Sequence, residues 1–374
     1  MSPLRAADVE AAAQRISGVV TPTPLQFSDR LSQLTGALVY LKREDLQVVR
    51  SYKVRGAYNL LKQLTPEEIA AGVVCASAGN HAQGFALACR SMGVHGRIYV
   101  PAKTPKQKRD RIRYHGGEFV ELIVGGKTYD LAAEAALADV ARTGATLVHP
   151  YDDLRTMAGQ GTIAVEILDQ LDGEPYLVVV PVGGGGCISG ITSYLAERTT
   201  ATSVLGVEPA GAASMAAALA AGEPVTLEHV DQFVDGAAVA RAGQVPFTVL
   251  SAAGDMVSVT TVDEGAVCTA MLDLYQNEGI IAEPAGALSV AGLLEADVEP
   301  GSTVVCLISG GNNDVSRYGE VLERSLVHLG LKHYFLVDFP QEPGALRRFL
   351  DEVLGPNDDI TLFEYVKRSN RELG

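Results

Sequence analysis

The alternation of short apolar runs with segments of helical spacing constrains the fold of this chain most. Eight runs predict strands: 73–76, 97–100, 119–124, 146–148, 177–181, 204–207, 257–260 and 303–308. The segments between them predict helices: 106–115, 128–142, 161–171, 188–198, 263–276 and 284–295. Such alternation is typical of βαβ units and a mainly parallel sheet. Near-continuous Val, Leu and Ile in the strands predict sheets covered on both faces.

The number of strands predicts more than one sheet. Eight strands are more than one compact sheet usually contains, so we expect two α/β domains with open, twisted, mainly parallel sheets flanked by helices. The order of elements then changes. Residues 317–332 predict a helix and a hinge, and 333–339, 344–354 and 360–366 predict strand, helix and strand. Residues 333–374 therefore form a small separate α+β unit.

The charge balance excludes several partners. Lys and Arg number 30 against 45 Asp and Glu, a net charge of −15, which disfavours nucleic acid and anionic membranes. Residues 70–89 and 176–196 carry no charge over about a bilayer's length, but loops interrupt both, so we expect no membrane span. The five cysteines contain no CxxC pair and the N-terminus lacks an apolar signal core, which favours a reducing cytoplasm and no zinc site.

Residues 181–190, PVGGGGCISG, follow a strand and precede a helix. Consecutive glycines let the backbone approach a ligand, and N–H groups at a helix N-terminus bind anions. The pattern is neither GxGxxG nor GxxxxGK[ST], so it lacks the dinucleotide and P-loop signatures. A tight turn is the alternative, but one or two glycines would serve there. We therefore favour phosphate binding.

Two further loops follow strands. Residues 77–84, SAGNHAQG, suit a carboxylate, although Ser77 or Asn80 could instead cap the following helix. Residues 309–314, SGGNND, follow the strand at 303–308. Loops at the carboxyl ends of parallel strands converge on one crevice, which is where open α/β sheets bind ligands.

Lys53, in 51–57 (SYKVRGA), stands at a predicted helix start, where the helix dipole disfavours a cation. An exposed surface lysine is the alternative. A lysine, a phosphate cradle and a carboxylate loop are together what pyridoxal phosphate chemistry requires, because lysine carries the aldehyde as a Schiff base.

SYKVRGA, SAGNHAQG, GGGGCISG, EPAGA and SGGN together resemble threonine ammonia-lyase (threonine dehydratase), in the tryptophan-synthase-β-like, fold type II class of pyridoxal phosphate enzymes. The resemblance covers about 15–330. It implies a catalytic region, 1–330, with a smaller α/β subdomain at about 56–150 inserted in a larger one. Residues 333–374 resemble part of an ACT-like regulatory domain. A complete unit of that kind needs roughly 70 residues, which is more than the segment 333–374 contains. We therefore expect weak allosteric control.

This resemblance implies a cytoplasmic lyase that eliminates water from L-threonine and releases 2-oxobutanoate and ammonia, the first step of isoleucine biosynthesis. L-Serine is an alternative substrate and isoleucine the implied effector of a homodimer or homotetramer. Serine dehydratase and serine racemase, which share most motifs, are the rival enzymes. A non-catalytic amino-acid sensor is the rival from another class, against which the intact Lys53 and Ser309 argue.

The resemblance also assigns residues. Lys53 binds the cofactor and serves as base at Cα, Tyr52 packs beside the ring, and Ser309 faces the pyridine nitrogen. Asn80 bonds the phenolic oxygen. The substrate carboxylate is expected to bind the backbone N–H groups of Ser77, Ala78, Gly79, Asn80 and His81. The cofactor phosphate is expected to bind the backbone of Gly183, Gly184, Gly185, Gly186 and Cys187. A hydroxyl at Ser309 need not protonate the ring, which favours prompt elimination.

Two carboxylates keep open roles. Glu283 in EPAGA is either a helix N-terminal carboxylate or a residue near a cation or the substrate. Glu208 resembles a metal ligand of serine racemases, but Ser214 stands where those have Asp, so we expect no metal. Among these motifs we identify no evident acid for the leaving hydroxyl.

Overall fold

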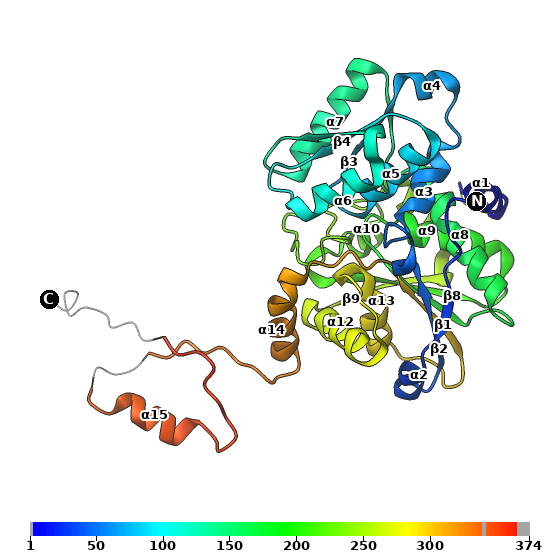
Figure 1. Cartoon of the computed structure of the whole chain (residues 1–374). Coiled ribbons are helices and arrows are strands. Elements are labelled where there is room, and N and C mark those ends of the chain that lie inside the picture. The colour runs from blue at the N-terminus through cyan, green and yellow to red at the C-terminus, as the bar shows by residue number, and fades with distance from the viewer. Residues whose placement is uncertain (1–2, 339–341, 365–374) are drawn as a thin grey trace. The chain divides into compact units, whose positions relative to one another are not determined.

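The computed structural model describes residues 3–338 and 342–364. Contacts divide the chain into two units, Met1–Leu331 and Lys332–Gly374. The first unit contains two sheets with helices on both faces (Figure 1). The larger sheet has the strand order β1 (Leu25–Phe27), β2 (Leu38–Arg43), β10 (Thr303–Ile308), β7 (Leu177–Pro181), β8 (Ser203–Pro209) and β9 (Val257–Val262). Its pairs are parallel except β1 with β2.

The smaller sheet is wholly parallel. Its order is β5 (Val120–Val124), β4 (Gly96–Val100), β3 (Val73–Ala76) and β6 (Thr146–Leu147). The prediction of two mainly parallel sheets is confirmed. β1 and β2 are additions that the sequence analysis missed.

The helices of the first unit include one for each predicted helical segment and several that the sequence analysis did not predict. They are α1 (Ala6–Ile16), α2 (Asp29–Thr35), α3 (Lys53–Leu61), α4 (Pro66–Ala71), α5 (Asn80–Met92), α6 (Lys106–Gly116), α7 (Tyr129–Thr143), α8 (Leu154–Gln170), α9 (Gly186–Arg198), α10 (Ser214–Ala221), α11 (Gln244–Ala253), α12 (Glu264–Glu278), α13 (Pro284–Glu295) and α14 (Tyr318–His328). α8 begins seven residues before its predicted start, at the N-cap Asp153, whose side chain accepts the Arg155 N–H. Local capping thus sets the boundary.

Alternate residues of the large sheet's strands face two cores, as covered parallel strands require. On the central strand β10, Val304 and Cys306 pack with α12 and α13. Val305 and Leu307 pack on the other face with α1, α8 and α9. The small sheet packs with α3 and α5 on one face and α7 on the other.

The second unit differs from its predicted form. Its described residues hold α15 (Ala345–Val353), which matches the predicted helix at 344–354. The predicted strands at 333–339 and 360–366 are wrong for 333–338 and 360–364, which carry no strand assignment. A strand forms only where hydrogen bonds to a neighbouring strand build a ladder, and an apolar pattern in the sequence does not ensure such a ladder. Residues 339 and 365–366 of these predicted strands lie outside the described residues.

The five cysteines are all buried and unpaired. Cys75 and Cys89 lie in the core of the small sheet, and Cys268 and Cys306 lie on one face of the large sheet. Cys187 lies at the start of α9. Burial raises the pKa of every one of these thiols, to about 12 for Cys187 and Cys268. All five are therefore neutral in the folded chain.

Among the described residues, no helix is both long and apolar enough to cross a membrane.

Candidate active site

One pocket gathers the expected residues from three loops at the carboxyl ends of strands. It is lined by Tyr52, Lys53, Asn80, Pro181, Val182, Gly183, Gly236, Ala237, Glu283, Ala285 and Ser309. Gly183 follows β7, Ser309 follows β10 and Asn80 follows β3. The structure thus brings these loops together, as strand polarity requires. The other expected residues, Ser77, Ala78, Gly79, His81 and Gly184 to Cys187, do not line it.

Lys53 lies in the first turn of α3, and its side chain reaches into the pocket. Its Nζ donates to the carbonyl of Pro150 at 3.3 Å and lies 5.0 Å from the centre of the Tyr52 ring. Burial lowers the pKa of Lys53 to about 8, partly opposed by Cys187 and Glu283. A neutral amine is therefore accessible near neutral pH, as a nucleophile or base requires.

The glycine loop forms an anion site. α9 begins at Gly186, and Gly185 before it has a φ of 90°. Among the described residues, none accepts a hydrogen bond from the N–H groups of 183–188. Unpaired donors at the positive end of a helix dipole suit a phosphate. This cradle beside Lys53 fits pyridoxal phosphate.

Three of the four glycines are also required by packing. A Cβ at Gly184 would lie 2.4 Å from the Tyr151 ring, and one at Gly186 would lie 2.8 Å from the Tyr151 backbone. A Cβ at Gly185 would lie 2.4 Å from Met215. The inference that a turn alone needs only one or two glycines was therefore too simple. The unpaired N–H groups, and not the glycine count, indicate the ligand.

The SAGNHAQG loop leads into α5, whose N-cap is Gly79 without a side-chain cap. Neither Ser77 nor Asn80 caps the helix. The Ser77 hydroxyl accepts the Gly79 N–H at 3.3 Å, and the Ser77 N–H donates to the Tyr99 carbonyl. Ser77 therefore has no free N–H for a carboxylate.

Asn80 and Glu283, which lie 203 residues apart in the sequence, are joined by a side-chain hydrogen bond. The Asn80 side-chain amide donates to Glu283 Oε1, and Asn312 donates to Asn80 Oδ1 at 2.7 Å. Burial raises the pKa of Glu283 to about 7, and Asp235 adds to the shift, while the Asn80 bond opposes it. Glu283 is thus a pocket carboxyl that can hold a proton near neutral pH, and the sequence analysis had left its role open. The EPAGA motif marked its position, but not its partner.

The remaining candidates have defined contacts. His81 Nε2 lies 2.8 Å from the Val148 carbonyl oxygen, and burial lowers its pKa to about 3, so the ring is neutral. Ser309 Oγ donates to the Ala285 carbonyl at 3.2 Å. Glu208 accepts the N–H groups of Met215 and Ala216, both at 2.8 Å, and so acts as a cap for α10. The described residues contain no group of three metal-ligating side chains.

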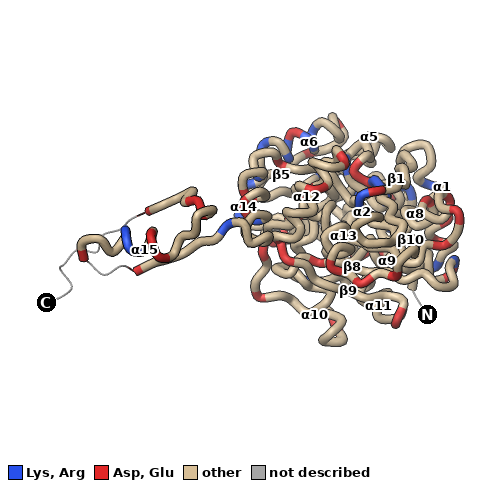
Figure 2. The backbone as a smooth tube through the Cα atoms, turned by 90° about the horizontal axis from the view of Figure 1, so that it is seen from below, with Lys and Arg blue, Asp and Glu red and all other residues tan. Residues whose placement is uncertain are grey.

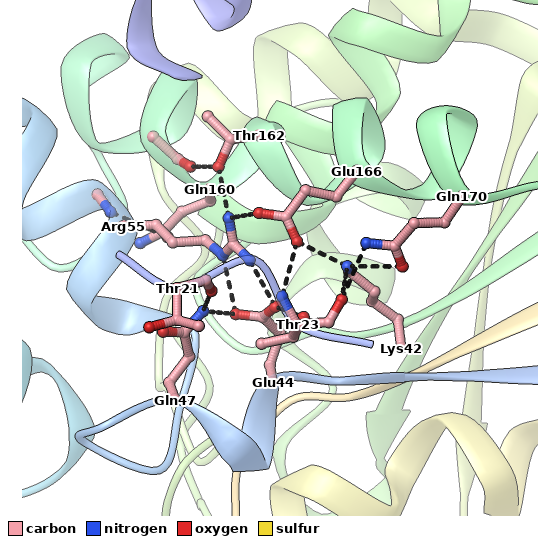
Figure 3. Close-up of polar contacts among 12 residues, drawn as sticks. Thr21, Thr23, Lys42, Glu44, Gln47, Arg55, Gln160, Thr162, Glu166 and Gln170 are labelled. Atoms are coloured by element: carbon pink, nitrogen blue, oxygen red, sulfur yellow. Dashed lines mark hydrogen bonds and ion pairs between the residues drawn. The ribbon is translucent and has the colours of Figure 1, made fainter. Parts of the chain in front are cut away.

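A buried ionic network surrounds Arg55 (Figure 3). Arg55, two residues after Lys53, donates two bonds to Glu44 at 2.7 and 2.8 Å, and one to Glu166 at 2.6 Å. Lys42 Nζ donates to Glu166 at 2.6 Å. Two cations and two carboxylates thus balance, which burial demands. The network ties α3 to β2, to the η1 turn (Glu44–Leu46) and to α8.

Comparison with known families gives two matches within the chain. The model of the pyridoxal-phosphate dependent enzymes matches residues 16–310. The model of the C-terminal regulatory domain of threonine dehydratase matches residues 323–374.

Individual relatives cover most of the chain. The L-threonine dehydratase biosynthetic IlvA of Mycobacterium tuberculosis is 85% identical over 371 residues, which are 99% of this chain and 86% of the relative. That of Corynebacterium glutamicum is 63% identical, with the same coverage. The processed form of threonine deaminase isoform 2 from Solanum lycopersicum has a TM-score of 0.80 at 37% identity, covering 85% of this chain and 92% of that structure. Maize serine racemase has a TM-score of 0.79 at 30% identity, covering 87% and 99%.

Proposed function

The chain belongs to the pyridoxal-phosphate-dependent enzymes, among the biosynthetic threonine dehydratases, and we propose that the pocket around Lys53 eliminates water from L-threonine. The products are 2-oxobutanoate and ammonia. One observation carries the assignment: Lys53, Asn80, Gly183 and Ser309 line a single pocket beside the unpaired N–H groups of the glycine loop.

Pyridoxal phosphate, when bound, supplies an electron sink for the bond broken at the substrate's Cα. The chain supplies the proton transfers and the orientation. Lys53 Nζ would hold the cofactor and would take the Cα proton, a task that its lowered pKa favours. The N–H groups of 183–188 would hold the phosphate, and the neutral hydroxyl of Ser309 would be the partner of the ring nitrogen. Tyr52, kept neutral because burial raises its pKa, would contact the ring.

The substrate groups meet the SAGNHAQG loop and Glu283. The Ser77 N–H already donates to the Tyr99 carbonyl, whereas the N–H groups of Ala78, Asn80 and His81 make no such bond. We assign these three N–H groups to the substrate carboxylate. Glu283, with its pKa raised to about 7, is a pocket carboxyl that can hold a proton for the leaving hydroxyl.

The test is an absorbance spectrum with pyridoxal phosphate, coupled to an assay of 2-oxobutanoate from L-threonine. Lys53→Ala should lose both the Schiff-base absorption and turnover. Lys62→Ala, an exposed lysine at the end of the same helix, is the matched control and should keep both. Cofactor that is still reducible by borohydride in Lys53→Ala would overturn the assignment. L-Serine turned over faster than L-threonine, or racemised, would favour the rival enzymes.

We assign residues 332–374 to regulation, with isoleucine as effector. The match of the regulatory-domain model to 323–374 supports this. We further propose that the chain forms a homodimer or homotetramer. We also propose that it works in the cytoplasm, because five buried unpaired thiols suit a reducing compartment. Sedimentation of the purified chain with and without isoleucine tests the oligomer and the effector together.

A further inference from the structure

α14 holds a loop that lies far from it in the sequence. The guanidinium carbons of Arg317 and Arg324 lie 4.6 and 4.2 Å from the centre of the Phe233 ring. Arg317 also donates to the Phe233 carbonyl at 2.9 Å, and Arg324 lies 3.8 Å from Asp231. Phe233 is 3% exposed. These three residues, Phe233, Arg317 and Arg324, form what we call the Phe233 clamp.

The segment after Phe233 leads directly into the pocket. The Val234 carbonyl accepts the N–H groups of Ala237 and Ala238, which makes a tight turn. Gly236 and Ala237 line the pocket within this turn. A Cβ at Gly236 would lie 2.8 Å from Ala285, so this wall already touches the start of α13. A shift of Phe233 would therefore move the pocket wall.

A second contact holds the same turn from the small sheet's side. Lys108, on the basic helix α6 (Figure 2), pairs with Asp235 at 2.5 Å. Both side chains are about a third exposed, so this pair contributes little by itself. The buried ring of Phe233 is the stronger anchor, because a cation over an aromatic face gains strength when it is partly desolvated.

We propose that Arg317 and Arg324 are positioning residues that fix the Gly236–Ala237 wall of the substrate pocket through Phe233. The inference rests on the proposed function for the identity of the substrate. It goes further in giving α14 a part in substrate binding. The chain passes from α14 through 329–331 into the second unit, and the regulatory-domain match already includes Arg324. A change in the position of α14 would therefore move the Gly236–Ala237 wall of the pocket.

The test compares Arg317→Ala/Arg324→Ala and Phe233→Leu with the unaltered full chain. We expect KM for L-threonine to rise about tenfold with kcat within about twofold, because the wall is displaced while Lys53 stays in place. Adding the arginine changes to Phe233→Leu should cost little more, since all three act as one unit. A general loss of folded protein would instead lower apparent kcat and leave KM unchanged.

Hydrogen exchange in the chain without cofactor gives a readout independent of activity. The amides of 233–239 should exchange faster in the variants, whereas the amides of 73–92 should not. Arg198→Ala removes a guanidinium that lies 5.9 Å from the Tyr194 ring, and is the matched control that should change neither measurement. Unchanged KM, or unchanged exchange at 233–239, overturns the proposal. A wild-type chain inactive on L-threonine would count against the proposed function, and exchange would still decide on the clamp.

Discussion

Replacing Arg55 by Met should destabilise the first unit strongly. The change removes both bonds to Glu44, whose side chain is fully buried and keeps only the Thr23 hydroxyl and a 3.3 Å contact from Gln47. Glu166 keeps its bond to Lys42. The main cost is thus one unpaired carboxylate, and breaking such a buried pair costs about 3–5 kcal/mol. That is a large part of a typical total of about 5–15 kcal/mol.

Urea unfolding monitored by circular dichroism measures this cost, and pH checks its cause. Burial alone raises the pKa of Glu44, but Arg55 holds it below its usual value. In wild type this contributes stability above the unfolded pKa, which is lost as the pH falls. Without Arg55 the folded pKa of Glu44 lies above the unfolded one, so the variant gains stability on acidification. The deficit should therefore shrink between pH 7.5 and pH 5.

The matched control is Arg198→Met. Arg198 pairs with Glu10 at 2.7 Å, but both side chains are about 40% exposed. We expect a loss below about 1 kcal/mol there. A loss of that small size for Arg55→Met, or a deficit equal at both pH values, would show that the network does not act through the Glu44 charge.

Two further substitutions test the site, and the addition of isoleucine tests the second unit. Ser309→Asp should slow the release of 2-oxobutanoate and give a new absorbing species, because a carboxylate there would keep the pyridine nitrogen protonated; an unchanged rate and spectrum would show that Ser309 does not contact the ring. Gly184→Ala should weaken pyridoxal phosphate binding about tenfold in a fluorescence titration, since its Cβ would meet Tyr151 at 2.4 Å; unaltered affinity would show that the loop is not the cradle. Isoleucine should change the rate less than about twofold, because 332–338 and 342–364 hold one helix and no paired strand; strong cooperative inhibition would show that these elements suffice.

The sequence predicted the parallel sheets because their strands are apolar on both faces, and it missed β2 because that strand is not uniformly apolar. Leu38–Arg43 ends in Lys42 and Arg43, whose charges hide an otherwise apolar strand. Those charges are satisfied by Glu166 and Asp45, and Glu166 lies more than 120 residues away. No local pattern reveals such a distant partner.

The sequence analysis predicted that this helix begins at Gly161, seven residues after the actual start of α8. Gly159 and Gly161 both lie inside the helix, although glycine disfavours helix interiors. A Cβ at Gly159 would lie 2.6 Å from the Arg55 carbonyl, and one at Gly161 would lie 2.6 Å from the Gly190 carbonyl. These glycines let α3 and α9 approach α8 closely, which costs some helix propensity. In this chain, tertiary packing outweighs local preference.

The candidate site was predictable where one loop carries it, as at Lys53 and the glycine run. It was not predictable where two distant segments meet. The Asn80–Glu283 bond and the Gly236–Ala237 wall depend on how the strands are ordered in the sheets. Strand order follows from long-range packing and not from any motif.

The placement of the five thiols allows cysteine labelling to report partial unfolding of the chain. Each is inert to alkylating reagents while it stays buried and neutral. Cys75 and Cys89 report on the small sheet's core, Cys268 and Cys306 on the large sheet, and Cys187 on the glycine loop. The order in which an alkylating reagent labels them therefore gives the order in which these parts of the molecule open, without any engineered cysteine.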